Sequence, residues 1–97
     1  MSKPLTIVAI IRAKDGCREA VAAQLHTLLA PSRRDPGCLN YDLHISLETP
    51  GLFLFYENWA TRADWEAHMA TPHLVAWKAQ AADLVADTQL LQMEPTG

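Results

Sequence analysis

Hydrophobic residues follow two different periods along this chain, one typical of strands and the other of helices. Residues 38–47 alternate between apolar and polar, which predicts a strand with one buried face. Residues 52–59 follow a turn at residues 49–51, so these two segments are predicted to pair as an antiparallel hairpin. Residues 5–12 are apolar on both alternating sides, which predicts a strand that is buried, or nearly so, on both faces.

The segment between the first two strands carries a helical period. Val21, Leu25 and Leu28 lie on one stripe of a helix predicted over residues 17–34. Proline lacks a backbone N–H, so Pro31 should kink the last turn or end the regular helix.

A second helical region contains two helix starts. Thr61 is followed three residues later by Asp64, which is the pattern of a capping box. Thr71 then precedes Pro72, and these are preferred residues for the N-cap and the first helical position. We therefore expect a short helix to about residue 70 and a further helix to about residue 86.

These elements occur in the order β-α-β-β-α-β, with the second helix in two pieces. The order predicts a ferredoxin-like split βαβ arrangement, an α+β fold in which four antiparallel strands carry helices on one face. The length of 97 residues suits a single domain over residues 1–97. The predicted strands cover residues 5–12, 38–47, 52–59 and 88–93, and the predicted helices cover residues 17–34, 61–70 and 71–86.

The first strand leaves apolar residues on the side of the sheet that no helix should cover. Val8 and Ile10 alternate with the core residues, and the chain has no predicted element left to pack on them. At roughly 25 cal/mol per Å², several hundred Å² of wet apolar sheet would sacrifice several kcal/mol. We therefore expect a homodimer in which two sheets pack face to face.

Composition and charge indicate which binding partners and which cellular compartment to expect. The net charge is -3, and Asp35 directly follows the only basic cluster, Arg33-Arg34, so no nucleic-acid surface is expected. No apolar run approaches the ~18 residues that cross a membrane, and the N-terminus reads as a strand, not a signal peptide. Cys17 and Cys38 lack metal-ligand spacing, so we expect free thiols in a cytoplasmic protein and no zinc or iron–sulfur site.

Residues 53–73 concentrate the candidate chemistry. Glu57 shares a strand face with Phe55 and Trp59, and a carboxylate buried there must be paired, hydrogen-bonded or shifted in pKa. In a functional role it orients a histidine or helps to move a proton. In a structural role it ties the strand to a helix. Phe55 and Trp59 either stack on a flat substrate or pack in the core. Asn58 is a candidate hydrogen-bond donor to substrate, but alternation points it away from Glu57.

Three histidines are candidate acid–base groups, because a pocket imidazole titrates near neutral pH. His68 either takes a proton from a phenol or enol, or packs beside Trp65 on the same helix face. His73 lies at the start of a predicted helix, where the helix dipole disfavours a positively charged imidazole. It either acts as a base or hydrogen-bond donor, or only caps the break between the two helices. His44 shares the polar face of its strand with Asp42, and it either contacts substrate or lies at the dimer seam.

The strings PGCLNYDLHIS, FLFYENW and HMATPH, at this spacing, resemble the antibiotic biosynthesis monooxygenase (ABM) family. The resemblance covers residues 5–93 and is most specific in YENW, EAH and TPH. It implies a dimeric ferredoxin-like α+β barrel and, for several members, oxidation of quinols or polycyclic phenols by oxygen without metal or flavin. Other members degrade haem with an asparagine on the first strand, which LTIVAIIR does not contain.

The leading hypothesis is therefore a cofactor-independent monooxygenase that acts on a quinol or related phenolic ligand. His68 or His73 would be the base and Glu57 its partner. The predicted substrate contacts are Trp59, Phe55, His44 and Asn58. Two alternatives remain open: an isomerase of a small hydroxyketone or phosphosugar that uses the same histidines, and a non-catalytic dimer that binds a small apolar ligand.

Overall fold

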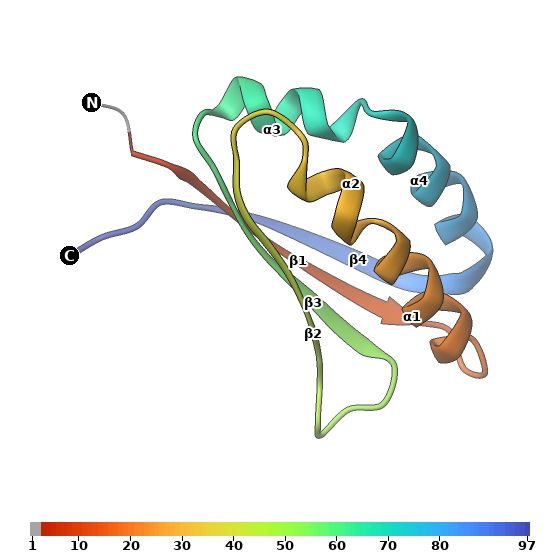
Figure 1. The fold of residues 1–97 in the computed structure, drawn as a ribbon. Coiled ribbons are helices and arrows are strands. Elements are labelled where there is room, and N and C mark those ends of the chain that lie inside the picture. Colours follow the sequence, from red (N-terminus) through yellow and green to blue (C-terminus); the bar gives the residue numbers. More distant parts are fainter. Residues whose placement is uncertain (1–2) are drawn as a thin grey trace.

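One antiparallel sheet carries all the helices on a single face (Figure 1). The computed structural model describes residues 3–97 and confirms the predicted ferredoxin-like α+β fold. The last helix ends earlier and the last strand begins earlier than predicted. The strands are β1 (Leu5–Ala13), β2 (Cys38–Ile45), β3 (Leu52–Trp59) and β4 (Val85–Met93), and the helices are α1 (Arg18–Thr27), α2 (Leu29–Arg33), α3 (Arg62–Met69) and α4 (Pro72–Leu84).

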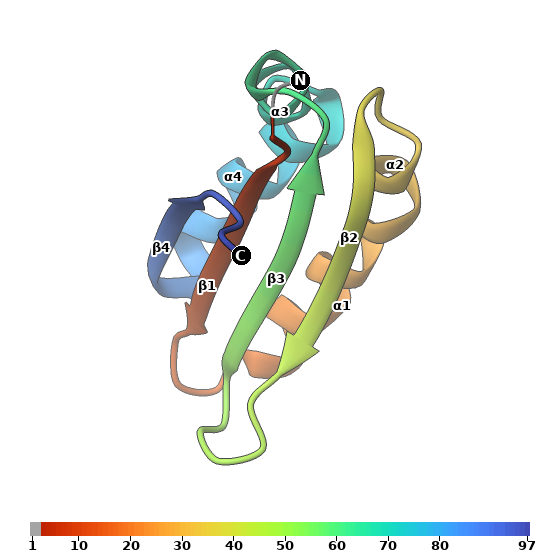
Figure 2. The same ribbon diagram turned by 90° about the vertical axis from the view of Figure 1, so that its left-hand side faces the viewer.

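Strand order sets which side chains face the helices. The order is β2-β3-β1-β4, so β1 lies inside the sheet between β3 and β4 (Figure 2). The register places Ile7 opposite Glu57 and Ala9 opposite Phe55. Side chains alternate between the two faces of a strand, so these four share one face with Trp59, and that face packs on the helices.

The core fills the space between the sheet and the helices. Val21 and Leu25 of α1 and Leu74 of α4 are buried against the inner side chains of the strands. Burying a large apolar side chain stabilises a fold by ~1.5–3 kcal/mol, so a few such residues account for much of what holds the helices to the sheet.

The first helical region is broken, but not where the proline predicts. The break falls at Leu28, between α1 and α2, and Pro31 is the third residue of α2. The first amides of a helix have no intrahelical partner, so a proline in the first turn loses no hydrogen bond. The predicted kink at Pro31 is therefore replaced by a new helix that accommodates it.

The other face of the sheet carries no helix within the described part of the chain (Figure 2). It presents Val8, Ile10 and Leu54, all partly exposed, together with Tyr56 and Met93, which are exposed. This is the apolar face that the first strand predicts.

Leu39 departs from the predicted alternation of β2. The register shifts between Cys38 and Asn40, where the β2–β3 ladder is irregular, and Leu39 is 60% exposed. An extra residue on one strand re-aims its side chain, so Leu39 does not share the buried position of Tyr41.

Both cysteines, Cys17 and Cys38, are free thiols. In the described residues, none of the helices has the length and apolar character required to span a lipid bilayer.

Candidate functional site

A cavity of about 220 Å³ lies between the inner face of the sheet and helices α3 and α4. Its walls are mainly apolar and aromatic, with a few polar groups, as in most ligand pockets. The volume is below the ~300–1,000 Å³ of typical pockets, which favours a small ligand. The residues that matter most for its chemistry are Tyr41, Phe55, Glu57, His68, Trp77 and Lys78.

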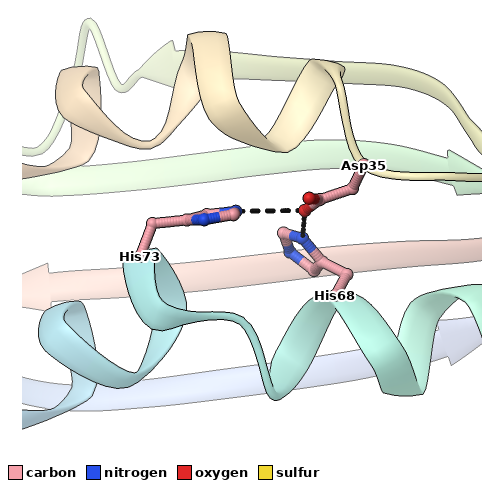
Figure 3. A group of neighbouring side chains, drawn as sticks. All are labelled: Asp35, His68 and His73. Carbon is pink, nitrogen blue, oxygen red and sulfur yellow. Dashed lines mark hydrogen bonds and ion pairs between the residues drawn. The ribbon is translucent and has the colours of Figure 1, made fainter.

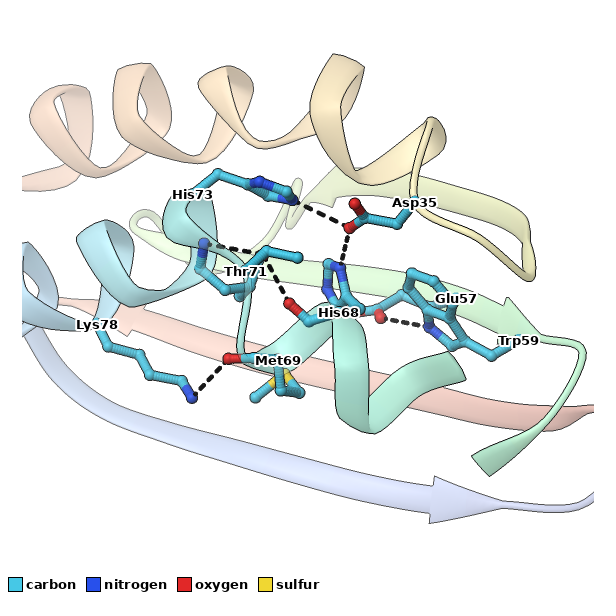
Figure 4. A network of polar contacts seen from close by, with 9 residues as sticks. Asp35, Glu57, Trp59, His68, Met69, Thr71, His73 and Lys78 are labelled. Carbon is cyan, nitrogen blue, oxygen red and sulfur yellow. Dashed lines mark hydrogen bonds and ion pairs between the residues drawn. The ribbon is translucent and has the colours of Figure 1, made fainter. Parts of the chain in front are cut away.

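Glu57 brings a carboxyl group from β3 to the cavity wall. Its side chain is buried, and Oε1 accepts a hydrogen bond of 3.0 Å from Nε1 of Trp59 (Figure 4). Burial raises the pKa of Glu57 from its ordinary 4.5 to about 7, and the hydrogen bond from Trp59 opposes that rise. Glu57 can therefore hold or release a proton near neutral pH.

His68 projects from α3 onto a carboxylate of a distant turn. Its Nδ1 donates to Oδ2 of Asp35 at 2.7 Å, and Asp35 lies between α2 and β2 (Figure 3). A carboxylate only accepts, so this contact puts the imidazole proton on Nδ1. The second nitrogen, Nε2, then carries the lone pair, and His68 is one of the residues that line the cavity.

The surroundings keep the imidazole of His68 neutral. The residue is 2% exposed, and burial lowers the pKa of His68 below its ordinary value, while Asp35 opposes this effect. The ring lies 4.4 Å from that of Trp59 and 5.4 Å from that of Tyr41, measured between centroids. Burial also raises the pKa of Tyr41 well above its usual range, so its hydroxyl stays protonated at the cavity wall.

His73 approaches the same carboxylate oxygen from the start of α4. Its Nε2 donates to Oδ2 of Asp35 at 3.0 Å, so one oxygen accepts from both imidazoles (Figure 3). The two histidines lie on either side of the break between α3 and α4. Thr71 holds that break, since its hydroxyl donates to the carbonyl of His68 and accepts from the amide of Leu74 (Figure 4).

Gly37 allows the turn that carries Asp35 to approach α3. It adopts a φ of +78°, and a Cβ atom added there would collide with the side chain of Asp64. Its carbonyl accepts from the amide of Ala60 at 2.8 Å, which ties this turn to the end of β3. A side chain at this position would displace either the turn or the first turn of α3.

The family model described as "Antibiotic biosynthesis monooxygenase" matches residues 4–80. The chain belongs to this family. The predicted resemblance is thus confirmed, and the family, together with the names of its relatives, supports monooxygenase activity for this ABM protein.

Curated relatives and solved structures agree with this assignment. The ABM protein is 31% identical to "Putative monooxygenase Rv0793" of Mycobacterium tuberculosis, over 88% of its own chain and 83% of the relative. It is 26% identical to "Probable quinol monooxygenase YgiN" of Escherichia coli, over 94% and 97% of the two chains. It spans only 56% of an uncharacterized Synechocystis protein to which it is 31% identical. The crystal structure of PA3566 from Pseudomonas aeruginosa superposes with a TM-score of 0.96 at 36% identity, over 100% of this chain and 98% of that one.

The structure divides the predicted site residues of this ABM protein into three groups. Phe55, Glu57 and His68 line the cavity. Two others contact His68 or its partner instead: the ring of Trp59 packs against that of His68, and His73 hydrogen-bonds to Asp35, the carboxylate that also binds His68. The remaining two, His44 and Asn58, lie on the outer face of the sheet, where Asn58 bonds with Asn40 and Thr6.

Asp35 is the functional residue that the sequence pattern does not reveal. In the sequence it reads as the start of an Asp-Pro-Gly stop after a helix, and as a counter-charge to Arg33-Arg34. Its contacts are with residues 33 and 38 positions away, which no local period encodes. A carboxylate two residues before a turn glycine is the only local signal for it.

The same three residues form a group that could hold a metal ion. The ligand atoms of Asp35, His68 and His73 all lie within 4.8 Å of one another. Sequence spacing does not show this group because its members come from a turn and two helices.

Proposed function

We propose that this ABM protein oxidises a quinol or a related phenol with molecular oxygen and that neither metal nor organic cofactor takes part. The Asp35–His68 pair, set against a small aromatic cavity, carries the proposal. The name of its relative YgiN supports a quinol as the substrate class. The cavity volume of about 220 Å³ favours a substrate of one or two fused rings.

His68 is the base in this proposal. Asp35 holds the proton on Nδ1, so the lone pair of Nε2 is available to take a phenolic proton. Asp35 also stabilises the imidazolium that results. His73 acts as a positioning residue here, since its bond to Oδ2 keeps the carboxylate aimed at His68.

The quinol anion then reduces oxygen directly. One electron passes from the anion to oxygen, and the superoxide and the ring radical combine into a peroxide at a ring carbon. The imidazolium of His68 returns its proton to the peroxide, which loses water and leaves a new carbonyl group. One quinol and one O₂ thus give one hydroxyquinone and one water, with one oxygen atom in each product.

The other cavity groups assist this reaction. Phe55 and Trp77 supply aromatic walls that exclude water from the peroxide. Glu57, which carries a proton near neutral pH, is placed to donate it to a substrate oxygen.

Oxygen uptake by the purified protein in the presence of a chelator tests the proposal. With a reduced naphthoquinol, we expect oxidation well above autoxidation, and His68→Gln should lower the rate at least ~100-fold, the contribution of a general base. Asp35→Asn should lower it while the quinol still binds. His26→Gln is the matched control, because His26 is an exposed histidine on α1. No acceleration across a panel of quinols, or equal rates for His68→Gln and the wild type, would refute the proposal.

The same base could serve an isomerase, but the cavity gives that reading less support. A phosphosugar needs cations for its phosphate, and Lys78 is the one cation among the described residues that line the cavity. Exchange of a substrate carbon-bound proton with solvent in the absence of oxygen would favour the isomerase.

We also propose that the protein works as a homodimer through the outer face of its sheet. The apolar residues Val8, Ile10 and Leu54 on that face support this assembly, and His44 and Asn58 would then lie at its seam. Leu54→Lys should shift the mass measured by light scattering from a dimer to a monomer. A wild-type monomer at micromolar concentration would exclude the dimer. The cytoplasmic location stays a prediction.

A further inference from the structure

Asp35, His68 and His73 bring three metal-ligand atoms close together (Figure 3), and of the three only His68 also lines the cavity. We propose that these three residues bind a divalent transition-metal cation of the zinc(II) class, and that its binding withdraws His68 from proton transfer. The binding stands on the geometry alone, whereas its effect on turnover rests on the proposed function.

The distances are close to those of a metal site. Oδ2 of Asp35 lies 2.7 Å from Nδ1 of His68 and 3.0 Å from Nε2 of His73. Zinc bonds of 2.0–2.1 Å place the ligand atoms of a tetrahedral site about 3.3 Å apart. The Asp35–His68 pair must therefore open by about 0.6 Å and the Asp35–His73 pair by about 0.3 Å to admit the ion. The two nitrogens lie within 4.8 Å of each other.

The donor set suits this class of cation. Two imidazoles and one carboxylate are ligands of borderline zinc-like ions, and three protein ligands leave a fourth position for water. A neutral imidazole is the form that binds a metal, and burial lowers the pKa of His68, which favours this form. Arg33 bonds to the carbonyl of Tyr41 and Lys78 to that of Met69, and in the described part of the chain neither forms an ion pair with Asp35.

The site is accessible from solvent on one side. The side chains of Asp35 and His73 are 12% and 21% exposed, whereas that of His68 is 1% exposed. A hydrated cation can therefore reach the carboxylate and His73 first. As it binds, the proton on Nε2 of His73 and the proton on Nδ1 of His68 each move to the other nitrogen of the same ring.

Metal binding inverts the hydrogen-bonding role of His68. A cation on Nδ1 occupies the lone pair of that nitrogen, so a neutral ring must carry its proton on Nε2. Nε2 then changes from a hydrogen-bond acceptor to a donor. The imidazole can still hydrogen-bond a substrate oxygen, but it can no longer remove a phenolic proton.

Titration of the chelator-treated protein with cobalt(II) or zinc(II) alone tests the binding. We expect one equivalent to bind, with the visible absorption of a low-coordinate cobalt site. His73→Gln and Asp35→Asn should each weaken binding at least ~10-fold, since even changes to groups behind a ligand have that effect. His26→Gln should bind as the wild type does. Circular dichroism verifies that each variant is folded. If His73→Gln does not fold, the binding test relies on Asp35→Asn, which keeps the shape of the side chain.

The outcomes separate this inference from the proposed function. Absence of stoichiometric binding, or equal affinity in the wild type and both ligand variants, would overturn the metal site whatever the activity. Nitrogen NMR of the histidines should show the proton of His68 move from Nδ1 to Nε2 when zinc is added, and an unchanged tautomer would also overturn it. If zinc binds as expected but no quinol is oxidised in its absence, only the proposed function fails.

Discussion

The buried carboxyl group of Glu57 makes the stability of the fold depend on pH. Its pKa is raised from 4.5 to about 7 in the folded protein, because burial disfavours the charged form. A raised folded-state pKa means that the native state binds the proton more tightly than the unfolded chain. The stabilisation is therefore complete below the unfolded pKa and is lost as the pH rises through the folded one.

The Glu57→Gln variant measures this effect. Glutamine keeps an oxygen that accepts from Trp59 but carries no charge. The pKa rises from 4.5 to about 7, which at 1.36 kcal/mol per pKa unit amounts to about 3 kcal/mol for the whole titration. From about pH 5 to about pH 8, the wild type should lose about 2–3 kcal/mol of unfolding free energy relative to the variant.

Urea unfolding followed by tryptophan fluorescence, in a buffer with a chelator, gives these free energies at each pH. The difference between the two proteins is the decisive quantity, because all other titrating groups are common to both. A difference that stays constant over this range would refute the reasoning, since it would mean that the carboxyl group titrates alike in the folded and unfolded chains.

Two further predictions concern the turn before β2 and the partner of Glu57. Gly37→Ala should lower the free energy of unfolding by more than Gly16→Ala, as measured by urea unfolding. Both glycines have a positive φ, which costs ~1–2 kcal/mol for other residues. Only a Cβ atom at Gly37 would also collide with Asp64. Equal losses would show that the turn yields. Trp59→Phe should raise the pKa of Glu57 further, because it removes a hydrogen bond that lowers this pKa. Carbon NMR of the Glu57 carboxyl group measures the midpoint of its titration, and a midpoint that is unchanged or lower in the variant would contradict the prediction.

The sequence predicts the parts of the site that follow a local period. Strand alternation places Phe55, Glu57 and Trp59 on one face, and the structure has them there. The threonine and proline at residues 71 and 72 predict the helix break, and Thr71 caps α4 as expected. These features depend on neighbours within a few residues, which is why pattern alone suffices.

Features that depend on tertiary contacts are not predictable in this way. Asp35 joins the candidate site only because folding brings α3 and the start of α4 to its turn. Likewise, Leu39 leaves its expected face because the ladder shifts against β3, which is decided by the pairing and not by β2 itself. Pro31 lies inside a helix because a new helix starts just before it.

The shared oxygen of Asp35 has a consequence for how this site can change during evolution. A replacement at residue 35 alters the surroundings of His68 and His73 in one step, whereas a replacement of either histidine leaves the other contact in place. Lineages that lose the carboxylate thereby lose the selective reason to keep both imidazoles. Among homologues, residues 35, 68 and 73 should therefore vary as a set, and a histidine retained without its carboxylate would point to a different use of the cavity.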